Sequence, residues 1–265
     1  MNTAAFMATH PVFSLEEATV ALAPPGGRPG AVQRLKHHLA SGRLSLVSRG
    51  VYAVVPAGVT SAAFRPDPFL VAAAARRDAV FAYHSALELL GVAYSAWSLT
   101  SVYTARRRGR LALDSAEIAF YEDPLALRTE QARYLGTRKV ERRGRMLEVT
   151  GPERTLVEGL RKPALAGGIE ELLRSTGAFP TLDLALLREI LFRYDTARLW
   201  AATGWILEQY QISFSVPDVF LDDLELRRPT AALYLQRAQR GGRLATRWNL
   251  VIPEVVYHLS AADER

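Results

Sequence analysis

Residues 14–54 read SLEEATVALAPPGGRPGAVQRLKHHLASGRLSLVSRGVYAV, and this stretch decides the expected fold of the first part of the chain. Ser14 followed by Glu17 predicts a capping box, in which the hydroxyl and the carboxylate each accept a hydrogen bond from a free backbone N–H at a helix start. Pro24-Pro25-Gly26-Gly27 then ends the helix, because proline lacks the N–H donor and glycine costs backbone entropy.

A second helix is expected over about residues 30–41. Val32, Leu35 and Leu39 recur at helical spacing and form one apolar stripe. Two short strands then flank Ser48-Arg49-Gly50, which predicts a hairpin turn. Helix, turn, basic helix and hairpin in this order predict a winged helix-turn-helix, a module that places its second helix in the major groove of DNA.

The polar side of the second predicted helix, with its flanks and the hairpin tip, supplies the candidate DNA contacts. Arginine suits bidentate contacts to guanine and to phosphate, and a residue at the tip can reach the DNA backbone or the minor groove. The predicted DNA-binding residues are Arg28, Gln33, Arg34, Lys36, His37, Ser41, Arg43 and Arg49. Similar patterns also occur in protein-interaction modules, and a basic helix face is often simply solvated, so both interpretations stay open here.

The composition is that of a globular protein. The chain has 265 residues, of which 49% are hydrophobic and 23% charged, enough for one large domain or two ordinary ones. A formal net charge of +6 favours a polyanionic partner. The absence of cysteine excludes disulfides, thiolate metal ligands and cysteine nucleophiles. No signal-peptide pattern and no membrane-length apolar run occurs, so a cytoplasmic protein without a membrane partner is expected.

Two domains are expected, a winged helix-turn-helix over residues 1–60 and an α/β domain over residues 66–265, because prolines and glycines punctuate the segment between them. Thr150 and Glu153 predict a second capping box. In the second domain, helices are expected at about 69–77, 85–90, 150–161, 168–175, 183–194, 196–210 and 217–227. Strands are expected at 98–105, 117–123, 232–236 and 246–253, with a hairpin over 138–149 that turns at Arg143-Gly144.

Two basic clusters and one isolated arginine mark the second domain. The clusters are either solvated charge or a second nucleic-acid surface that contacts phosphates or RNA. Arg154 falls in the first turn of its predicted helix, where a positive charge opposes the macrodipole, so it is either solvated or paired with a buried carboxylate. The clusters comprise Arg106, Arg107, Arg108 and Arg110, and Arg138, Lys139, Arg142, Arg143 and Arg145.

No pattern supports an enzyme, and no metal or cofactor is expected. The acidic residues of segment 217–227 are interpreted as a solvated helix face in preference to the Mg²⁺ site of a nuclease-like effector; they are Asp218, Asp222, Asp223 and Glu225. Glu122-Asp123 indicates a turn. The five histidines show no HExxH spacing, and His84 is expected to pack or cap locally. Neither a phosphate-binding P-loop nor a G-x-S-x-G nucleophile elbow is present.

Four segments resemble the AbiEi family of type IV antitoxins and predicted transcriptional regulators. They are GRLSLVSRGVYAV (42–54), AYHSALELLGV (82–92), LEVTGPERTLVEGL (147–160) and ATGWILEQ (202–209), and the resemblance covers about residues 13–253. It implies an N-terminal winged helix, a C-terminal α/β antitoxin domain, and repression through inverted repeats in the protein's own promoter. It also implies opposition to a nucleotidyltransferase-like toxin, with helix 30–41 and Arg49 as the DNA contacts.

The sequence therefore predicts an α+β protein in which a winged helix-turn-helix precedes a mixed α/β C-terminal domain. The expected function is that of a sequence-specific DNA-binding transcriptional regulator, an antitoxin and autorepressor that binds double-stranded DNA. Two alternatives remain: a protein- or RNA-interaction module without DNA readout, and a nuclease-like effector.

Overall fold

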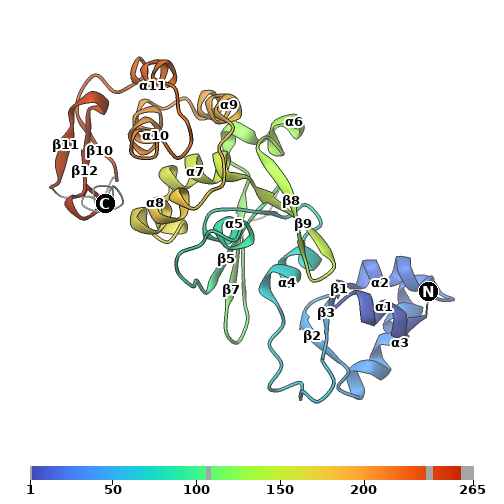
Figure 1. Cartoon of the computed structure of the whole chain (residues 1–265). Helices are drawn as coiled ribbons and strands as arrows, with labels where there is room; N and C mark the ends of the chain where they lie inside the picture. The colour runs from blue at the N-terminus through green and yellow to red at the C-terminus, as the bar shows by residue number, and fades with distance from the viewer. Residues whose placement is uncertain (1, 106–108, 237–240, 258–265) are drawn as a thin grey trace. The chain divides into compact units, whose positions relative to one another are not determined.

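A computed structural model describes residues 2–105, 109–236 and 241–257. The chain has a mixed α+β fold, with helices and three β-sheets (Figure 1). It divides into two compact units. The first comprises Met1–Phe81, Ser98–Glu122 and Lys139–Glu148, and the second comprises Ala82–Trp97, Asp123–Arg138 and Val149–Arg265. Independent folding of residues 1–60 and 66–265 stays a prediction.

The first unit begins with three helices and a three-stranded sheet. In chain order these elements are α1 (Thr3–Thr9), β1 (Val12–Ser14), α2 (Leu15–Leu22), α3 (Gly27–Ala40), β2 (Leu44–Ser48) and β3 (Val51–Val54). β3 lies in the middle of the sheet and pairs antiparallel with β1 and β2. Phe6, Phe13 and Leu35 are completely buried in its core. The sequence pattern does not predict α1 and β1, because each is too short to give a periodic signal.

A six-stranded sheet completes the first unit, and the ends of β8 and β9 continue into the second. Its order is β6-β7-β5-β4-β9-β8, with β5 and β7 parallel. The predicted strands at 98–105 and 117–123 and the hairpin over 138–149 are confirmed, whereas β4 and β6 are not predicted. The elements are α4 (Pro68–Ala75), β4 (Val80–Phe81), β5 (Leu99–Thr104), β6 (Gly109–Ala112), β7 (Glu117–Glu122), β8 (Thr137–Arg142) and β9 (Arg145–Thr150).

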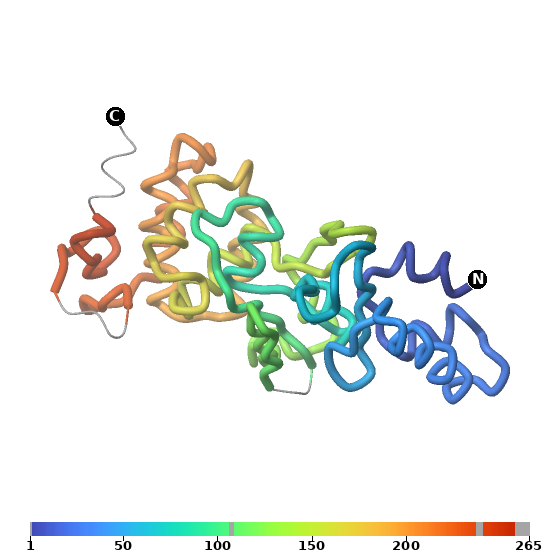
Figure 2. The backbone as a smooth tube through the Cα atoms, turned by 90° about the horizontal axis from the view of Figure 1, so that it is seen from below, coloured from blue at the N-terminus to red at the C-terminus, as the bar shows by residue number. Residues whose placement is uncertain are grey.

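The second unit is mainly helical, and its predicted helices are confirmed to within two residues at most ends. Both Figure 1 and Figure 2 show helices α7 to α11 gathered together. Its helices are α5 (His84–Leu89), α6 (Glu130–Arg133), α7 (Pro152–Arg161), α8 (Ile169–Gly177), α9 (Leu184–Tyr194), α10 (Ala197–Gln209) and α11 (Asp218–Glu225). The described part of this unit also contains the short 3-10 turns η1 (Leu125–Leu127), η2 (Pro163–Leu165) and η3 (Thr246–Trp248).

A small sheet near the C-terminus differs from the predicted pair of strands. It contains β10 (Leu233–Tyr234), β11 (Arg243–Ala245) and β12 (Leu250–Ile252), in the order β10-β12-β11, and β10 runs parallel to β12. The sequence does not predict β11. Gly204 in α10 allows helix and turn to meet here, because a Cβ at this position would lie 2.1 Å from Cζ3 of the buried Trp248.

The predicted capping box of Thr150 and Glu153 is wrong. α7 begins at Pro152 with Gly151 as its N-cap, and no side chain caps it. The Thr150 hydroxyl instead lies 2.7 Å from the Thr155 hydroxyl, and the Glu153 carboxylate accepts a 2.8 Å hydrogen bond from the backbone N–H of Asp183. Proline suits the first helical position, so the helix starts one step later and both polar groups serve other contacts.

Arg154 is completely buried and has a buried carboxylate partner, so the solvated interpretation is wrong. Its Nε donates to Glu158 Oε1 at 2.8 Å, and its Nη1 donates to the carbonyl oxygens of Arg133 and Leu135 at 2.6 and 3.1 Å. The Tyr194 hydroxyl donates to the same Glu158 oxygen at 2.6 Å. Burial, followed by the Glu158 charge, raises the pKa of Tyr194.

Candidate nucleic-acid interface

The capping box at the start of α2 is confirmed. The Glu17 backbone N–H donates to Ser14 Oγ at 3.1 Å, and the Ser14 N–H donates to Glu17 Oε2 at 2.7 Å. Leu15, Ala18 and Leu22 are buried on the inner side of the helix. Because both orphan N–H groups are satisfied locally, α2 has a defined start directly after β1.

The proline- and glycine-rich turn between α2 and α3 lets the start of α3 pack closely against the preceding loop. Gly26 and Gly27 have positive φ angles of 81° and 58°, which side chains rarely adopt. Gly30 has an ordinary helical backbone, but a Cβ added to it would lie 2.1 Å from the Pro25 carbonyl oxygen. Glycine at position 30 therefore lets the first turn of α3 pack against the preceding loop.

One side of α3 is buried and the other faces solvent. Ala31 and Leu35 are completely buried, and Val32 and Leu39 pack half-buried against the same core. All eight predicted DNA-binding residues are exposed. Gln33, Arg34 and His37 lie opposite the stripe of Ala31, Val32, Leu35 and Leu39 at 3.6 residues per turn, and Lys36 lies on the flank. The structure thus places Gln33, Arg34 and His37 on one exposed helix face, with Lys36 exposed at its edge.

The electrostatic character of this face is positive. α3 contains no aspartate or glutamate, and in the described part of the chain no ion pair joins Arg34 or Lys36 to a carboxylate. Burial, followed by the charges of His37 and Arg43, lowers the pKa of neighbouring His38. An exposed helix face with uncompensated cations and one amide can bind a polyanion and can donate hydrogen bonds to base edges.

The remaining predicted contacts surround α3. Arg49 and Gly50 form the turn between β2 and β3, with Gly50 at a φ of 79°, so the predicted hairpin is confirmed. Ser41 is the C-cap of α3 and donates to the His38 carbonyl at 3.3 Å, and Arg43 follows it. Arg28 sits in the first turn of α3, away from the Gln33 face, and lines a hollow together with Arg49.

The second predicted basic surface is partly used inside the first unit. Arg142 Nε donates to Asp67 Oδ2 at 2.8 Å, and its guanidinium lies 4.3 Å from the centre of the Phe69 ring. Arg145 Nη2 donates to Glu17 Oε1 at 2.7 Å and to the Ala73 carbonyl at 3.2 Å. These two arginines join the β8–β9 hairpin to α4 and α2, so they contribute little free charge to a surface.

The other described members of the two clusters are exposed. Arg138 and Lys139 are exposed, Arg143 lies 3.7 Å from Asp67, and Arg110 pairs with Glu117 at 2.6 Å. Arg106, Arg107 and Arg108 lie outside the described residues.

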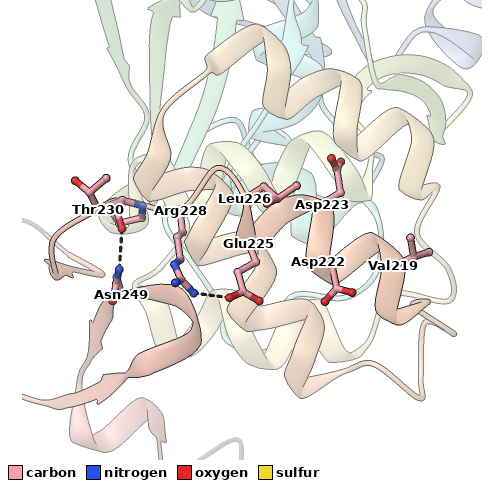
Figure 3. A pocket seen from close by; sticks show the side chains of 9 residues that line it. Val219, Asp222, Asp223, Glu225, Leu226, Arg228, Thr230 and Asn249 are labelled. Atoms are coloured by element: carbon pink, nitrogen blue, oxygen red, sulfur yellow. Dashed lines mark hydrogen bonds and ion pairs between the residues drawn. The ribbon is translucent and has the colours of Figure 1, made fainter.

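Three acidic residues of α11 are paired with arginines, and the fourth, Asp218, accepts a 2.7 Å hydrogen bond from Gln211 Nε2. Asp222 and Glu225 pair with Arg247 at 2.6 and 2.9 Å, and Asp223 lies 3.3 Å from Arg188. Figure 3 shows Asp222, Asp223 and Glu225 along the edge of a surface hollow, with Glu225 joined to Arg228. In the described ranges no group of three or more acidic or histidine side chains has the arrangement of a metal site.

His84 is buried in the second unit beside a carboxylate. Its Nε2 lies 3.5 Å from Glu171 Oε1, and its ring stacks on Trp97 with centroids 5.4 Å apart. Burial lowers the pKa of His84, although the Glu171 charge acts in the opposite direction. Asp123, expected in a turn, is buried and lies 3.3 Å from the Arg133 guanidinium. Both members of each pair are buried, so these contacts are explained as packing.

Sequence reasoning misses Arg77, which lines the same hollow as Arg28 and Arg49. Arg77 follows α4 and pairs with Glu16 of α2 at 3.0 Å. A basic residue at a helix end gives no signal of a partner more than sixty positions earlier in the sequence, so only the folded arrangement reveals it.

None of the helices in the described ranges has the length and apolar character that a membrane-spanning helix needs. No protein-family model and no curated protein matches the chain. Among solved structures, the chain is similar to the RV2827C protein from Mycobacterium tuberculosis, with a TM-score of 0.63 and 18% sequence identity. The similarity covers 98% of this chain and 93% of that one. At this identity it shows a shared fold.

Proposed function

We propose that the N-terminal part of the first unit is a winged helix-turn-helix that binds double-stranded DNA, and that the protein is a sequence-specific transcriptional regulator. The observation that carries the proposal is the exposed face of α3. It presents Gln33, Arg34 and His37, with Lys36 at its flank, and α3 carries no carboxylate. Glutamine and arginine are side chains that read adenine and guanine edges in the major groove.

The surrounding elements support this placement. α2 and α3 are joined by a tight turn, and the β2–β3 hairpin follows α3 directly. In this arrangement α3 is the recognition helix and Arg49 at the hairpin turn contacts a phosphate or the minor groove. The formal net charge of +6 favours association with a polyanion.

A more specific proposal rests on the resemblance to the AbiEi family. The protein is then an antitoxin that represses its own promoter through inverted repeats and opposes a nucleotidyltransferase-like toxin. The segment 66–265 is the part of the chain proposed to carry the antitoxin activity. Co-expression with the toxin encoded by the neighbouring gene tests this part: growth should be restored by the full chain and also by an Arg34→Ala variant. Loss of protection in that variant would contradict a separation of the two activities.

Gel shifts on the upstream promoter region and on a random duplex test DNA binding. Arg34→Ala should weaken specific binding by about 1–3 kcal/mol, the usual value of one good base contact. Arg193 in the second unit is also about half-exposed, so Arg193→Ala is a matched control that should bind like the wild type. Equal loss on both duplexes would demote Arg34 to a phosphate contact, and no loss on either would refute the placement of α3.

The proposed contact of Arg49 should affect the salt dependence of DNA binding. Arg49→Ala should weaken binding similarly on both duplexes and should lower the slope of log K against log salt by about 1, the value expected for one lost phosphate contact. An unchanged salt dependence would show that the turn between β2 and β3 does not touch DNA.

A further inference from the structure

A hollow of about 380 Å³ lies in the first unit, on the side of α3 that carries Arg28. Residues from α2, the first turn of α3, the β2–β3 turn and the end of α4 line it. Its size falls in the range of about 300–1,000 Å³ that small-molecule sites occupy. Four chain segments that are separate in sequence therefore converge on one concave surface.

The charge of the hollow is positive. Arg28, Arg49 and Arg77 line it, and Glu16 is the one carboxylate among its lining residues. Arg77 pairs with Glu16 at 3.0 Å, and in the described ranges no ion pair engages Arg28 or Arg49. Three guanidinium groups against one carboxylate suit a phosphate, because the planar guanidinium matches its oxygens in a bidentate manner.

The polar and apolar lining suits more than an isolated phosphate. Ser14 and Ser48 also line the hollow and carry hydroxyl groups that can donate to an anion. Leu15 and Val51, which are buried, and Val20, which is 73% exposed, also line the hollow. Such a surface can cover the apolar part of a ligand, which a DNA phosphodiester does not offer.

We infer that this hollow binds a small phosphorylated organic molecule, with Arg28, Arg49 and Arg77 around the phosphate and the apolar residues against the organic part. Arg49 is also a proposed DNA contact, so an occupied hollow draws its guanidinium group away from the duplex. The ligand would then release the protein from its operator. This second step rests on the proposed function, whereas ligand binding itself does not.

Calorimetric titration of the full chain tests the site. Adenosine monophosphate is the probe, and inorganic phosphate and adenosine are the two partial ligands. Adenosine monophosphate should bind saturably and more tightly than either partial ligand. Arg77→Ala should weaken its binding by about ten- to a hundredfold, the usual effect of losing a hydrogen bond to a charged group.

Arg65→Ala is the matched control, because Arg65 also pairs with an exposed carboxylate, that of Asp114 at 3.4 Å, and does not line the hollow. It should bind adenosine monophosphate like the wild type. No saturable binding, or equal losses in the two variants, would overturn the proposal. If inorganic phosphate binds as tightly as adenosine monophosphate, the assigned role of the apolar residues is wrong.

A gel shift in the presence of adenosine monophosphate tests the coupling. The nucleotide should release DNA from the wild type and should do so only at much higher concentration with Arg77→Ala, whose DNA affinity without nucleotide stays unchanged. If Arg77→Ala loses as much DNA affinity as nucleotide affinity, the hollow is a seat for a backbone phosphate and the small-molecule proposal fails. Nucleotide binding that depends on Arg77 without any DNA binding would support the site and refute the proposed function alone.

Discussion

Replacement of Gly30 by alanine is the substitution that most directly tests how the turn positions α3. The residue has a helical backbone, and alanine is normally preferred to glycine in a helix by about 1 kcal/mol. Here the added methyl group would lie 2.1 Å from the Pro25 carbonyl oxygen, where real Cβ atoms essentially never come closer than 3.0 Å. The turn and the start of α3 must therefore separate by roughly 1 Å, a backbone shift that no side-chain rotation relieves.

The magnitude follows from these two opposing effects. Overpacking of this kind costs about 1–3 kcal/mol, and the gain in helix propensity offsets about 1 kcal/mol of it. Gly30→Ala should therefore destabilise the first unit by up to about 2 kcal/mol. It should also weaken operator binding, because the exposed face of α3 moves relative to the β2–β3 turn. Gly109→Ala is the matched control, since nothing lies within 4 Å of a Cβ at that position.

The two units can be followed separately. All four tryptophans, Trp97, Trp200, Trp205 and Trp248, belong to the second unit, so tryptophan fluorescence reports on that unit alone. Denaturation followed by far-ultraviolet circular dichroism should show an earlier transition for Gly30→Ala, while the fluorescence transition stays in place. A variant as stable as the wild type, with unchanged DNA affinity, would refute the reasoning about the turn.

Three further predictions concern the second unit, with tryptophan fluorescence as the readout of unfolding. Arg154→Ala should lower the free energy of unfolding by about 3–5 kcal/mol, because it leaves a buried carboxylate without its cation. Arg193→Ala breaks an exposed pair of the same i,i+4 spacing and should lower it by less than about 0.5 kcal/mol. Equal losses in the two variants would contradict the importance of burial for the Arg154 pair. Gly204→Ala should destabilise by about 1–3 kcal/mol through collision with a buried indole ring, and a gain in stability would show that the ring moves aside freely. Burial lowers the pKa of His84 below its ordinary value of 6.5, so the native state binds fewer protons than the unfolded state in this range. The stability contributed by the neutral ring is complete above pH 6.5 and falls as the pH drops through the lowered pKa. His84→Leu should remove this slope, and an identical slope in the variant would assign it to other groups.

Local signals in the sequence predict local structure well. Ser14 and Glu17 form the expected capping box because both partners lie within one helical turn. The Arg143-Gly144 turn is also found, and both residues have positive φ angles, 50° and 82°, typical of a type I′ hairpin turn. The long apolar periodicity of residues 183–194 predicts α9 almost to its ends. In each case the energy that determines the structure comes from neighbours in the chain.

Contacts between distant segments could not be predicted. Arg145 pairs with Glu17, a residue 128 positions earlier, and neither the spacing nor the composition indicates it. The sequence of a basic cluster is the same whether its arginines face solvent or hold a hairpin in place. The same holds for Arg154, whose guanidinium donates to the carbonyl oxygens of the distant Arg133 and Leu135 as well as to Glu158 of its own helix. It holds also for Thr150, whose hydroxyl lies against that of Thr155 once Pro152 starts the helix.

The candidate interface could be predicted from the sequence only in part. The helical pattern places Gln33, Arg34 and His37 on the exposed side of α3, because burial of the opposite stripe determines which side faces solvent. The pattern does not reveal that Arg28 lines a separate hollow. Arg28 lies in the first turn of α3, where no earlier turn of the helix covers its side. Arg77 joins that hollow only through the packing of α4 within the first unit.

Directed cleavage of DNA from α3 is the measurement that tests the central claim most directly. The chain has no cysteine, so Ala40→Cys, on the exposed side of α3, provides a unique position for a tethered iron chelate that cuts nearby DNA. Val219→Cys, on an exposed part of α11, is the matched control. With the upstream promoter as substrate, the chelate at position 40 should give cuts confined to a few base pairs facing one major groove, and the chelate at position 219 should give none. Uniform cleavage from position 40, or localised cleavage from position 219 alone, would contradict the assignment of α3 as the recognition helix.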